Sequence, residues 1–380
     1  DDASGFCEEV EMKIIDKITD CKNRNETFVS LEFFPPRSAT GVANLEARWE
    51  RMRDVVDPLF TDITWGAGGS TSSLTMELTM KLKNIGLEPN THLTCTNVKK
   101  EEVVDALQTC RDAGVKNIVA LRGDPPIGQE KWEATDESFK CALDLVKFIR
   151  KEHGDFFNIA VAGYPEGHPD AILPTSQTFD ELSQAEQSRC RIAPDGSLHV
   201  CNDAKYAEEL AYLKAKVDAG SDIIITQMFF DCSTFAAFVQ AARKIGISVP
   251  IIPGIMVLQS AAGFKKMTNF CNTRVPPTLA KQVDACGDNE QQIKQLGIEL
   301  GVQMGKELIA QGVEGLHFYT LNLEKSTLAI IEKLGLTAKD RRKNKKVTYD
   351  KPIMTSTTWL GLAAVAAWAY FILLRPNLRR

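Results

Sequence analysis

The chain has 380 residues, of which 44% are hydrophobic and 25% charged, so it can bury a full core as one large barrel or two smaller domains. Its formal net charge is -5, but residues 339–380 carry ten Lys and Arg against two Asp. The preceding body is therefore acidic, which argues against general nucleic-acid binding. The ten cysteines form no CxxC pair, and so long a chain needs no disulfides, which favours free thiols in a reducing compartment.

The pattern of apolar residues predicts a leading helix within residues 1–26, followed by eight short strands that alternate with helices. The expected strands are Phe28–Phe33, Asp62–Trp65, Thr91–Cys95, Ile118–Leu121, Asn158–Ala162, Ile223–Gln227, Pro250–Pro253 and Leu316–Thr320. The expected helices include Ser73–Ile85, Lys100–Ala113, Phe139–Lys151, Tyr206–Ala219, Thr234–Gly246 and Asn289–Gln311. Gly220 stands where a helix end needs a left-handed residue.

Eight such units over roughly 300 residues favour an α/β fold, a (β/α)8 TIM barrel spanning residues 27–337. A doubly wound sheet would need a Gly-rich phosphate loop after its first strand, where this chain has Phe33-Phe-Pro-Pro-Arg37. A polar insert at residues 171–204 is either a lid or disordered. Whether Cys190 and Cys201 pair within this insert stays open.

The chain changes character after residue 337. Residues 338–352 form a basic linker that should be solvated. Residues 353–374 are uncharged with an apolar centre, and a basic tail follows at 375–380, which fits a transmembrane helix acting as a tail anchor. A buried terminal helix is the alternative, but it would need a partner to cover it. The anchor would leave the barrel in the cytoplasm, on the mitochondrial outer membrane or the endoplasmic reticulum.

Ligands of barrel proteins bind at the carboxyl ends of the strands. Here those ends carry polar and aromatic residues: Glu32, Thr64, Trp65, His92, Arg122, Asp124, Tyr164, His168, Gln227 and Tyr319. The His residues lack HxH or HxxxH spacing, so no metal site is expected, and no Ser stands in a nucleophile elbow.

Three of these residues suggest specific chemistry. Glu32 has apolar sequence neighbours, which would favour its protonated form and suit a general acid; a structural ion pair is the alternative. Asp124 lies two residues from Arg122 and should stay ionised, able to stabilise a developing positive charge; a plain surface pair is the alternative. The amide of Gln227 is either satisfied in the core or binds a polar heterocycle.

Several motifs together resemble one family, methylenetetrahydrofolate reductase. The resemblance covers about residues 26–336 and rests on nine stretches in the family's order: Leu31-Glu-Phe-Phe-Pro-Pro-Arg37, Thr64-Trp-Gly-Ala67, His92-Leu-Thr-Cys95, Ala120-Leu-Arg-Gly-Asp-Pro-Pro126, Gly163-Tyr-Pro-Glu-Gly-His-Pro-Asp170, Leu213-Lys-Ala-Lys-Val-Asp-Ala-Gly220, Ile225-Thr-Gln-Met-Phe-Phe230, Ile251-Ile-Pro-Gly-Ile255 and His317-Phe-Tyr-Thr-Leu-Asn322. Leu321-Asn-Leu-Glu-Lys325 is similar to plant and fungal members.

The resemblance implies a flavin-binding barrel that reduces 5,10-methylenetetrahydrofolate to 5-methyltetrahydrofolate with FAD and either NADPH or NADH. It implies three catalytic residues: Glu32 as proton donor to the folate, Asp124 beside the developing cation, and Gln227 bound to the pterin. Asp124, Gln227, Tyr319 and Leu323 would contact the folate. The implied FAD contacts are Thr64, Trp65, His92, Arg122, Gly123, Asp124, Cys141, Ala142, Tyr164, His168, Pro169, Asp170, Glu209 and Lys216. The implied nicotinamide contacts are Glu32, Phe33, Phe34, Pro35, Pro36, Arg37, Thr64 and Trp65.

The chain also departs from the family pattern. Ala261 aligns where the family usually has an aromatic residue, and Leu323 where some members have Arg. A basic and then apolar segment follows the barrel instead of the S-adenosylmethionine-binding domain of eukaryotic members, so we expect no inhibition by that compound. The alternatives are another pterin-binding barrel enzyme or a membrane-tethered scaffold without activity. A homo-oligomer stays open.

Overall fold

The computed structural model of the chain describes residues 12–65, 72–96, 98–123 and 138–349, with side chains as far as residue 343. Two compact units divide it, one up to Ala338 and one from Lys339 onward.

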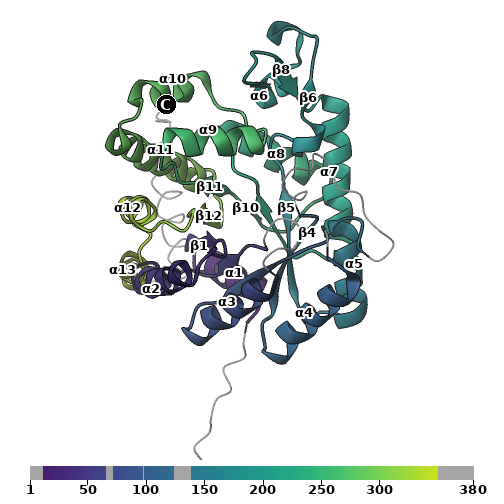
Figure 1. Cartoon of the computed structure of the whole chain (residues 1–380), viewed down its shortest axis with the longest axis vertical. Coiled ribbons are helices and arrows are strands. Elements are labelled where there is room, and N and C mark those ends of the chain that lie inside the picture. Colours follow the sequence, from purple (N-terminus) through teal and green to yellow (C-terminus); the bar gives the residue numbers. More distant parts are fainter. Residues whose placement is uncertain (1–11, 66–71, 97, 124–137, 350–380) are drawn as a thin grey trace, which may run out of the picture. The chain divides into compact units, whose positions relative to one another are not determined.

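A sheet of nine parallel strands forms the centre of the first unit, in the order β10-β9-β5-β4-β3-β2-β1-β12-β11 (Figure 1). Each of the eight predicted strands is confirmed, with its ends shifted by no more than two residues. The strands are β1 (Phe28–Phe33), β2 (Thr61–Ile63), β3 (Pro89–Thr94), β4 (Asn117–Leu121), β5 (Asn158–Gly163), β9 (Ile223–Thr226), β10 (Ile251–Ile252), β11 (Gly254–Met256) and β12 (Gly315–Tyr319).

The sheet closes around Pro253, which follows β10, the predicted seventh strand, and precedes β11, a short strand that was not predicted. β10 pairs with β9, and β11 pairs with β12, so this one segment joins the two edges of the sheet. Proline has no N–H to donate, and the break falls at this residue. Pro253 O still accepts from His317 N at 3.0 Å, and Gly254 N donates to Thr226 Oγ1 at 3.0 Å. The predicted barrel-like α/β fold is therefore confirmed.

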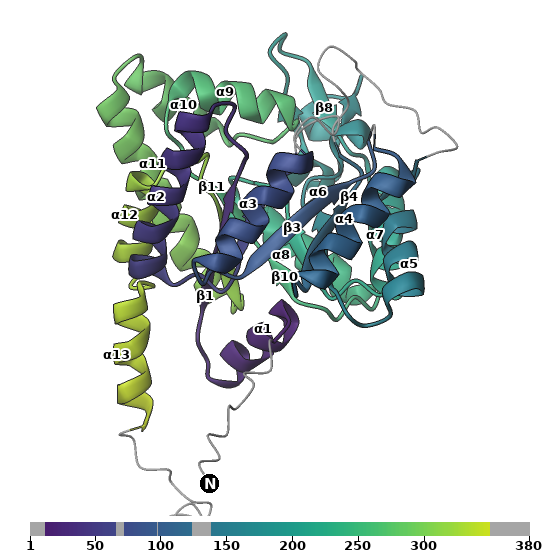
Figure 2. The same cartoon turned by 60° about the horizontal axis from the view of Figure 1, so that its bottom comes forward.

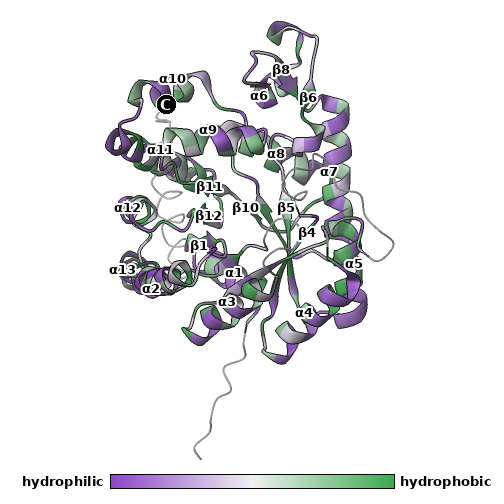
Figure 3. Cartoon of the chain, viewed as in Figure 1, coloured by the Kyte–Doolittle hydropathy of each residue, from purple (hydrophilic) through white to green (hydrophobic). Residues whose placement is uncertain are grey.

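Helices cover the outside of the barrel, as Figure 1 shows, and the strands at its centre are largely hydrophobic in Figure 3. The outward side chains of the strands pack on the helices; Phe33, for example, meets Trp49 edge to face at 6.0 Å. The helices are α2 (Ala39–Val56), α3 (Ser72–Asn84), α4 (Lys100–Asp112), α5 (Ala142–His153), α7 (Asp203–Asp218), α8 (Cys232–Lys244), α9 (Ala261–Phe270), α10 (Pro277–Cys286), α11 (Glu290–Ala310) and α12 (Lys325–Lys333). Gly220 follows α7 with φ +114°, as its position predicted.

The predicted leading helix is α1 (Ile14–Asn23), which lies below the barrel at the amino ends of the strands (Figure 2). Ile14 and Ile18 are buried with the inward-facing Phe28, Phe60 and Val119. Asn117 and Asn158, the first residues of β4 and β5, accept from the first N–H groups of α1 at 2.9 and 3.1 Å. These bonds satisfy donors that a helix start leaves unpaired. The barrel is thus closed below, and its upper end is left for a ligand.

The insert at 171–204 is folded. It contains a small antiparallel sheet, β6 (Leu173–Pro174), β8 (Leu198–Val200) and β7 (Arg191–Ile192), and the helix α6 (Gln184–Arg189). Its buried Arg189 pairs with Asp203 at 2.6 Å and lies 4.0 Å over the ring of Tyr206 on α7. The insert is therefore attached to α7 rather than disordered. Cys190 and Cys201 are both free thiols.

The second unit begins within α13 (Ala338–Tyr349), so the predicted basic linker is helical over most of its length. Lys and Arg are good helix formers, which is consistent with this helix. The predicted transmembrane segment 353–374 and the tail 375–380 lie outside the described residues. Within the described part of the chain, no helix combines the length and the apolar character needed to cross a membrane.

Candidate active site

The carboxyl ends of the strands surround a cavity of about 840 Å³, a volume typical of ligand sites. Most of the predicted site residues lie on its wall: Glu32, Phe33, Phe34, Thr64, Trp65, His92, Arg122, Gly123, Tyr164, His168, Pro169, Asp170, Gln227 and Tyr319. The barrel therefore gathers residues that are up to 287 positions apart in the sequence, as a strand-end pattern requires.

A polar network lies at the part of the cavity wall formed by β1, β2, β3 and β12. Oε2 of Glu32 is 3.6 Å from His92 Nε2 and 3.4 Å from His317 Nε2. His92 Nε2 is also 3.1 Å from Oδ2 of the buried Asp62. Asn90 donates to the other oxygen of Asp62 at 2.9 Å. The acid predicted at Glu32 is thus surrounded by titratable groups.

The surroundings of Glu32 differ from those expected. Its sequence neighbours Leu31 and Phe33 are buried in the core between strands and helices, because successive side chains of a strand point to opposite faces. Glu32 points into the barrel, towards two imidazoles. Burial alone would lower the pKa of His92, but its hydrogen bond with Asp62 and the charges of Glu32 and Asp62 outweigh this and raise it. The protonated form of His92 is therefore favoured beside the carboxyl group of Glu32.

Sequence reasoning missed four members of this network, and a simple signal could have found them. Ser30, Asp62, Asn90 and His317 each stand two positions before a predicted strand-end residue: Glu32, Thr64, His92 and Tyr319. A period of two places such residues on the same inner face, one layer deeper. The contacts agree, since His317 Nδ1 lies 3.0 Å from Ser30 Oγ.

Tyr319 on β12 is hydrogen-bonded to β9, at the place where β10 and β11 close the barrel. Its hydroxyl donates to Thr226 O at 2.6 Å. Burial, with the charges of Glu32 and Asp62, raises the pKa of Tyr319 well above its ordinary value, so it stays a neutral donor. A Cβ on Gly254 would come within 2.5 Å of the Tyr319 ring, so the glycine makes room for it.

Gln227 follows β9 and lines the cavity without being buried in the core. Its Oε1 accepts from Met228 N at 2.9 Å, which fixes the orientation of the amide. An amide held in this way presents its NH₂ group as a hydrogen-bond donor.

The loops after β4 and β5 meet at the cavity wall. Arg122 Nη1 pairs with Asp170 Oδ2 at 2.7 Å, and His168 Nδ1 accepts from Asp170 N at 3.1 Å. Burial lowers the pKa of His168 to about 4, against the opposing effect of Asp170, so this imidazole is neutral at pH 7. The predicted Asp124 lies outside the described residues. Arg122, expected beside Asp124, thus has a partner from a different strand end.

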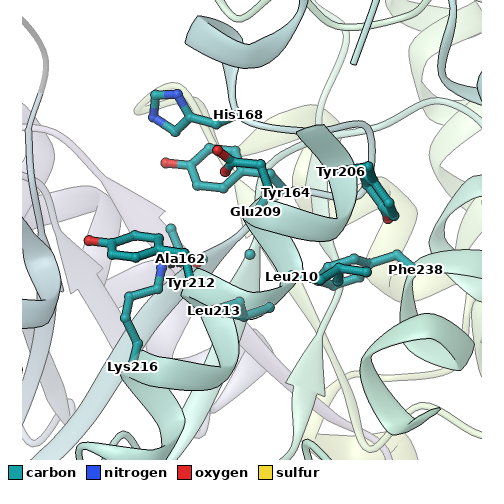
Figure 4. Close-up of a pocket in the computed structure, with 11 residues that line it drawn as sticks. Ala162, Tyr164, His168, Tyr206, Glu209, Leu210, Tyr212, Leu213, Lys216 and Phe238 are labelled. Carbon is teal, nitrogen blue, oxygen red and sulfur yellow. Dashed lines mark hydrogen bonds between the residues drawn. The ribbon is translucent and has the colours of Figure 1, made fainter. Parts of the chain in front are cut away.

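A side pocket opens beside the cavity and shares Ala162, Tyr164 and His168 with it (Figure 4). The predicted residues Glu209 and Lys216 line it from α7. Lys216 Nζ donates to Ala162 O at 2.9 Å. Burial lowers the pKa of Lys216 to about 8 and raises that of Glu209. A buried ammonium that is easily neutralised gains from an anionic ligand.

A few predicted contacts are not on the wall of either cavity. Cys141 and Ala142 lie at the start of α5, where Leu143 N donates to Tyr212 OH at 3.4 Å. Pro35 is buried, and Arg37 and Leu323 are exposed, outside the residues that line the cavity. Phe33 and Phe34 are both on the cavity wall, but the ring of Phe33 packs outward on Trp49.

The cavity fits an extended, partly anionic cofactor with a flat ring such as FAD. Two buried polar atoms on the cavity wall, Trp65 Nε1 and Thr94 Oγ1, have no hydrogen-bond partner among the described residues. A bound ligand could supply one. Lys216 adds a cation. Glu32, Asp62 and His317 place ligand atoms within 4.8 Å of one another, a grouping the sequence did not lead us to expect. Since each of these side chains has a hydrogen-bonding or ionic neighbour, we interpret them as a proton network rather than a metal centre.

Comparison with known proteins agrees with these features. A family model described as methylenetetrahydrofolate reductase matches residues 17–335. A relative from Zea mays, named methylenetetrahydrofolate reductase (NADH) 1, is 45% identical over 326 residues, which are 86% of this chain and 51% of that protein. The 5,10-methylenetetrahydrofolate reductase of Escherichia coli (strain K12) is 34% identical over 309 residues, 81% of this chain and 90% of that protein.

A solved structure from Clostridium thermocellum has the same fold, with a TM-score of 0.53 at 14% identity, covering 87% of this chain and 98% of that one. It is described as an uncharacterized protein that binds two copies of 5-methyl-5,6,7,8-tetrahydrofolic acid, and at this identity the likeness concerns the fold alone. The chain spans about half the length of the plant relatives it matches. With the family model covering most of the barrel, the chain belongs to the methylenetetrahydrofolate reductase family.

Proposed function

We propose that this chain reduces 5,10-methylenetetrahydrofolate to 5-methyltetrahydrofolate by a ping-pong reaction in one-carbon and methionine metabolism, with NADH or NADPH as hydride source and FAD as cofactor. Membership of the family supports the reaction class. The observation that carries the proposal is the position of Glu32, an acid at the cavity wall between the imidazoles of His92 and His317. Such an acid can supply the one proton that this reduction consumes.

When FAD is bound, it supplies the hydride chemistry. The chain must hold it, and the fitting contacts are Thr64, Trp65, His92, Arg122, Gly123, Tyr164, His168, Pro169, Asp170, Glu209 and Lys216. Phe34, Thr64 and Trp65 form the part of the wall assigned to the nicotinamide.

The remaining residues act on the folate. Glu32 donates its proton to a folate nitrogen, which lets the methylene bridge open to a cation. Gln227 offers its amide N–H to the pterin, and Tyr319 offers a neutral ring and hydroxyl. Asp124 is proposed on the family resemblance as the anion beside the developing cation.

The test separates the two half-reactions. Glu32→Gln keeps the shape of the side chain and removes its proton donation. Stopped-flow reduction of the bound flavin by NADH or NADPH should stay within about threefold of wild type, while folate reduction should fall by about 10²–10⁴-fold, the usual contribution of a general acid. Equal losses in both half-reactions would remove Glu32 from the proposed role. A purified protein that binds no flavin would instead favour another pterin-binding barrel or a scaffold.

We also propose that residues 353–374 span a membrane and leave the barrel in the cytoplasm, on the mitochondrial outer membrane or the endoplasmic reticulum. The support is sequence alone: 22 uncharged residues between basic flanks. A fluorescent fusion with and without residues 353–380 tests this, because an equally diffuse signal from both would remove the anchor.

A further inference from the structure

The inference concerns Asp62, a carboxylate that the strand-end pattern did not select. Its side chain is only 1% exposed and lies on the inner face of β2, at the wall of the cavity. Its two oxygens are occupied by Asn90 Nδ2 at 2.9 Å and His92 Nε2 at 3.1 Å. Among the described residues, no Lys or Arg forms an ion pair with it. A buried carboxylate without a cation is costly, so Asp62 favours the imidazolium form of His92.

His92 in turn connects Asp62 to Glu32. The same Nε2 atom lies 3.6 Å from Glu32 Oε2, slightly longer than a hydrogen bond and within reach after a small side-chain rotation. His92 is buried except for the part that lines the cavity, where water can reach it.

The charged and titratable groups around the pair can be named element by element. β1 contributes Glu32, β2 contributes Asp62, and β12 contributes His317 and Tyr319 on the far side of Glu32. On the other side of His92, β4 presents the apolar Val119 and Leu121 to the cavity. Within the described residues, Asp62 is thus the fixed charge closest to His92.

We propose that Asp62 is a positioning residue that keeps His92 protonated beside Glu32, so that the Glu32–His92 pair holds the proton needed for each folate reduction. This inference rests on the proposed function for its catalytic consequence, but the state of His92 does not depend on it.

The proton balance is simple. Glu32 gives its proton to the folate nitrogen and becomes a carboxylate. The N–H bond at His92 Nε2 breaks as an O–H bond forms at Glu32 Oε2. The neutral imidazole then takes one proton from bulk solvent, relayed by water in the cavity, so that each folate reduction consumes one solvent proton. Asp62 takes no proton and acts only through its charge. This agrees with the raised pKa of His92, to which the hydrogen bond with Asp62 contributes.

The test is the substitution Asp62→Asn, which removes the negative charge and keeps the shape of the side chain. The chain has five histidines, so ¹³C-histidine labelling and NMR can follow each imidazole against pH, with His92→Gln identifying the His92 signal. A unit charge about 3 Å away in a partly buried site should move the His92 midpoint down by at least one pH unit. Asp62→Glu should restore most of the shift.

The matched control is Asp222→Asn. Asp222 is a half-buried carboxylate that accepts from Ile159 N at 2.6 Å, near the amino ends of β5 and β9, outside the residues that line the cavity. Its removal should leave the His92 midpoint unchanged. If Asp62→Asn does not fold, as judged by circular dichroism, Asp62→Ser removes the same charge from a smaller side chain.

The catalytic readout is the pH profile of single-turnover folate reduction by pre-reduced protein. In Asp62→Asn its alkaline limb should move down by about one pH unit, with a rate loss of about tenfold above the limb, while flavin reduction by the nicotinamide changes less than about twofold. A His92 midpoint that does not move in Asp62→Asn overturns the inference. A different result would separate the two proposals. If the wild-type protein reduces no folate but the His92 midpoint still moves down in Asp62→Asn, the proposed function is overturned and the inference about Asp62 and His92 is kept.

Discussion

Tyr319 lies directly over Gly254, and its hydroxyl reaches across the seam of the barrel to Thr226 O at 2.6 Å. A Cβ at residue 254 would stand 2.4 Å from Thr226 O and 2.5 Å from Cε2 of Tyr319, distances that real side chains do not reach. The position of the tyrosine ring therefore depends on the absence of a side chain on the neighbouring strand.

Gly254→Ala should displace Tyr319 from the site. We expect the KM for the folate to rise about tenfold or more, because the ring and hydroxyl no longer meet the ligand, with a smaller change in flavin reduction by the nicotinamide. Steady-state kinetics with each substrate varied measure this.

Tyr319→Phe is the comparison, since it keeps the ring and removes only the hydroxyl. Because the hydroxyl proton goes to Thr226 O, the hydroxyl can only accept a hydrogen bond from the folate. Losing that bond corresponds to about 0.5–1.5 kcal/mol, or roughly a three- to tenfold rise in KM. If Gly254→Ala has a smaller effect than Tyr319→Phe, the ring does not depend on Gly254 in the way described.

The features of this site that depend on local sequence signals could be predicted, whereas those that depend on contacts between distant residues could not. The strands and their ends could be predicted, because apolar runs closed by Pro or charged residues are local signals; Glu32, His92, Gln227 and Tyr319 were found in this way and line one cavity. The ion pair between Arg122 and Asp170 could not be predicted, because Asp170 comes from a different loop, 48 residues away. Local spacing suggested Asp124 as a partner of Arg122, and Asp124 lies outside the described residues.

Other features depended on weak local signals. The insert has strands of two or three residues and a core of Leu182, Cys190 and Val200, which is too small to produce a periodic pattern. Its fold instead depends on long-range contacts such as the one between Arg189 and Tyr206. The break at Pro253 was visible in the sequence, but its role in closing the barrel follows only from the pairing of strands on both sides.

Glu166 should make the stability of the protein depend on pH. Its side chain is buried, and Oε2 accepts from Arg274 N at 2.7 Å. Burial raises the pKa of Glu166 from 4.5 to about 8, so between these values the folded chain holds a proton that the unfolded chain has released. The free energy of unfolding should therefore fall as pH rises from 4.5 to 8, by up to about 1.4 kcal/mol per pH unit.

Glu166→Gln removes this titration. Urea unfolding followed by circular dichroism at pH 5.5 and pH 7.5 should show a steeper loss of stability in the wild type than in the variant. Glu208→Gln, at an exposed carboxylate on α7, should behave like the wild type. Parallel pH dependences for wild type and Glu166→Gln would show that Glu166 is ionised in the folded chain.

Lys216 should take up a proton when the cofactor binds. Burial lowers the pKa of Lys216 to about 8, so at pH 8.5 a large fraction of the side chain is neutral in the free protein. A phosphate or another anionic part of FAD in the side pocket would favour the ammonium form and raise this pKa. Calorimetric titration of flavin-free protein at pH 8.5, in buffers of different ionisation enthalpy, should reveal net proton uptake.

Lys216→Met should abolish that uptake and weaken FAD binding by about 10- to 100-fold, since a hydrogen bond to a charged group contributes roughly 1.5–3 kcal/mol. Lys214→Met is the matched control, because Lys214 lies on the same helix and pairs with Asp218 on the outside. Its removal should leave both affinity and proton uptake unchanged. Equal proton uptake by wild type and Lys216→Met would place the responding group elsewhere, and Glu209, whose pKa burial raises, would be the next residue to test.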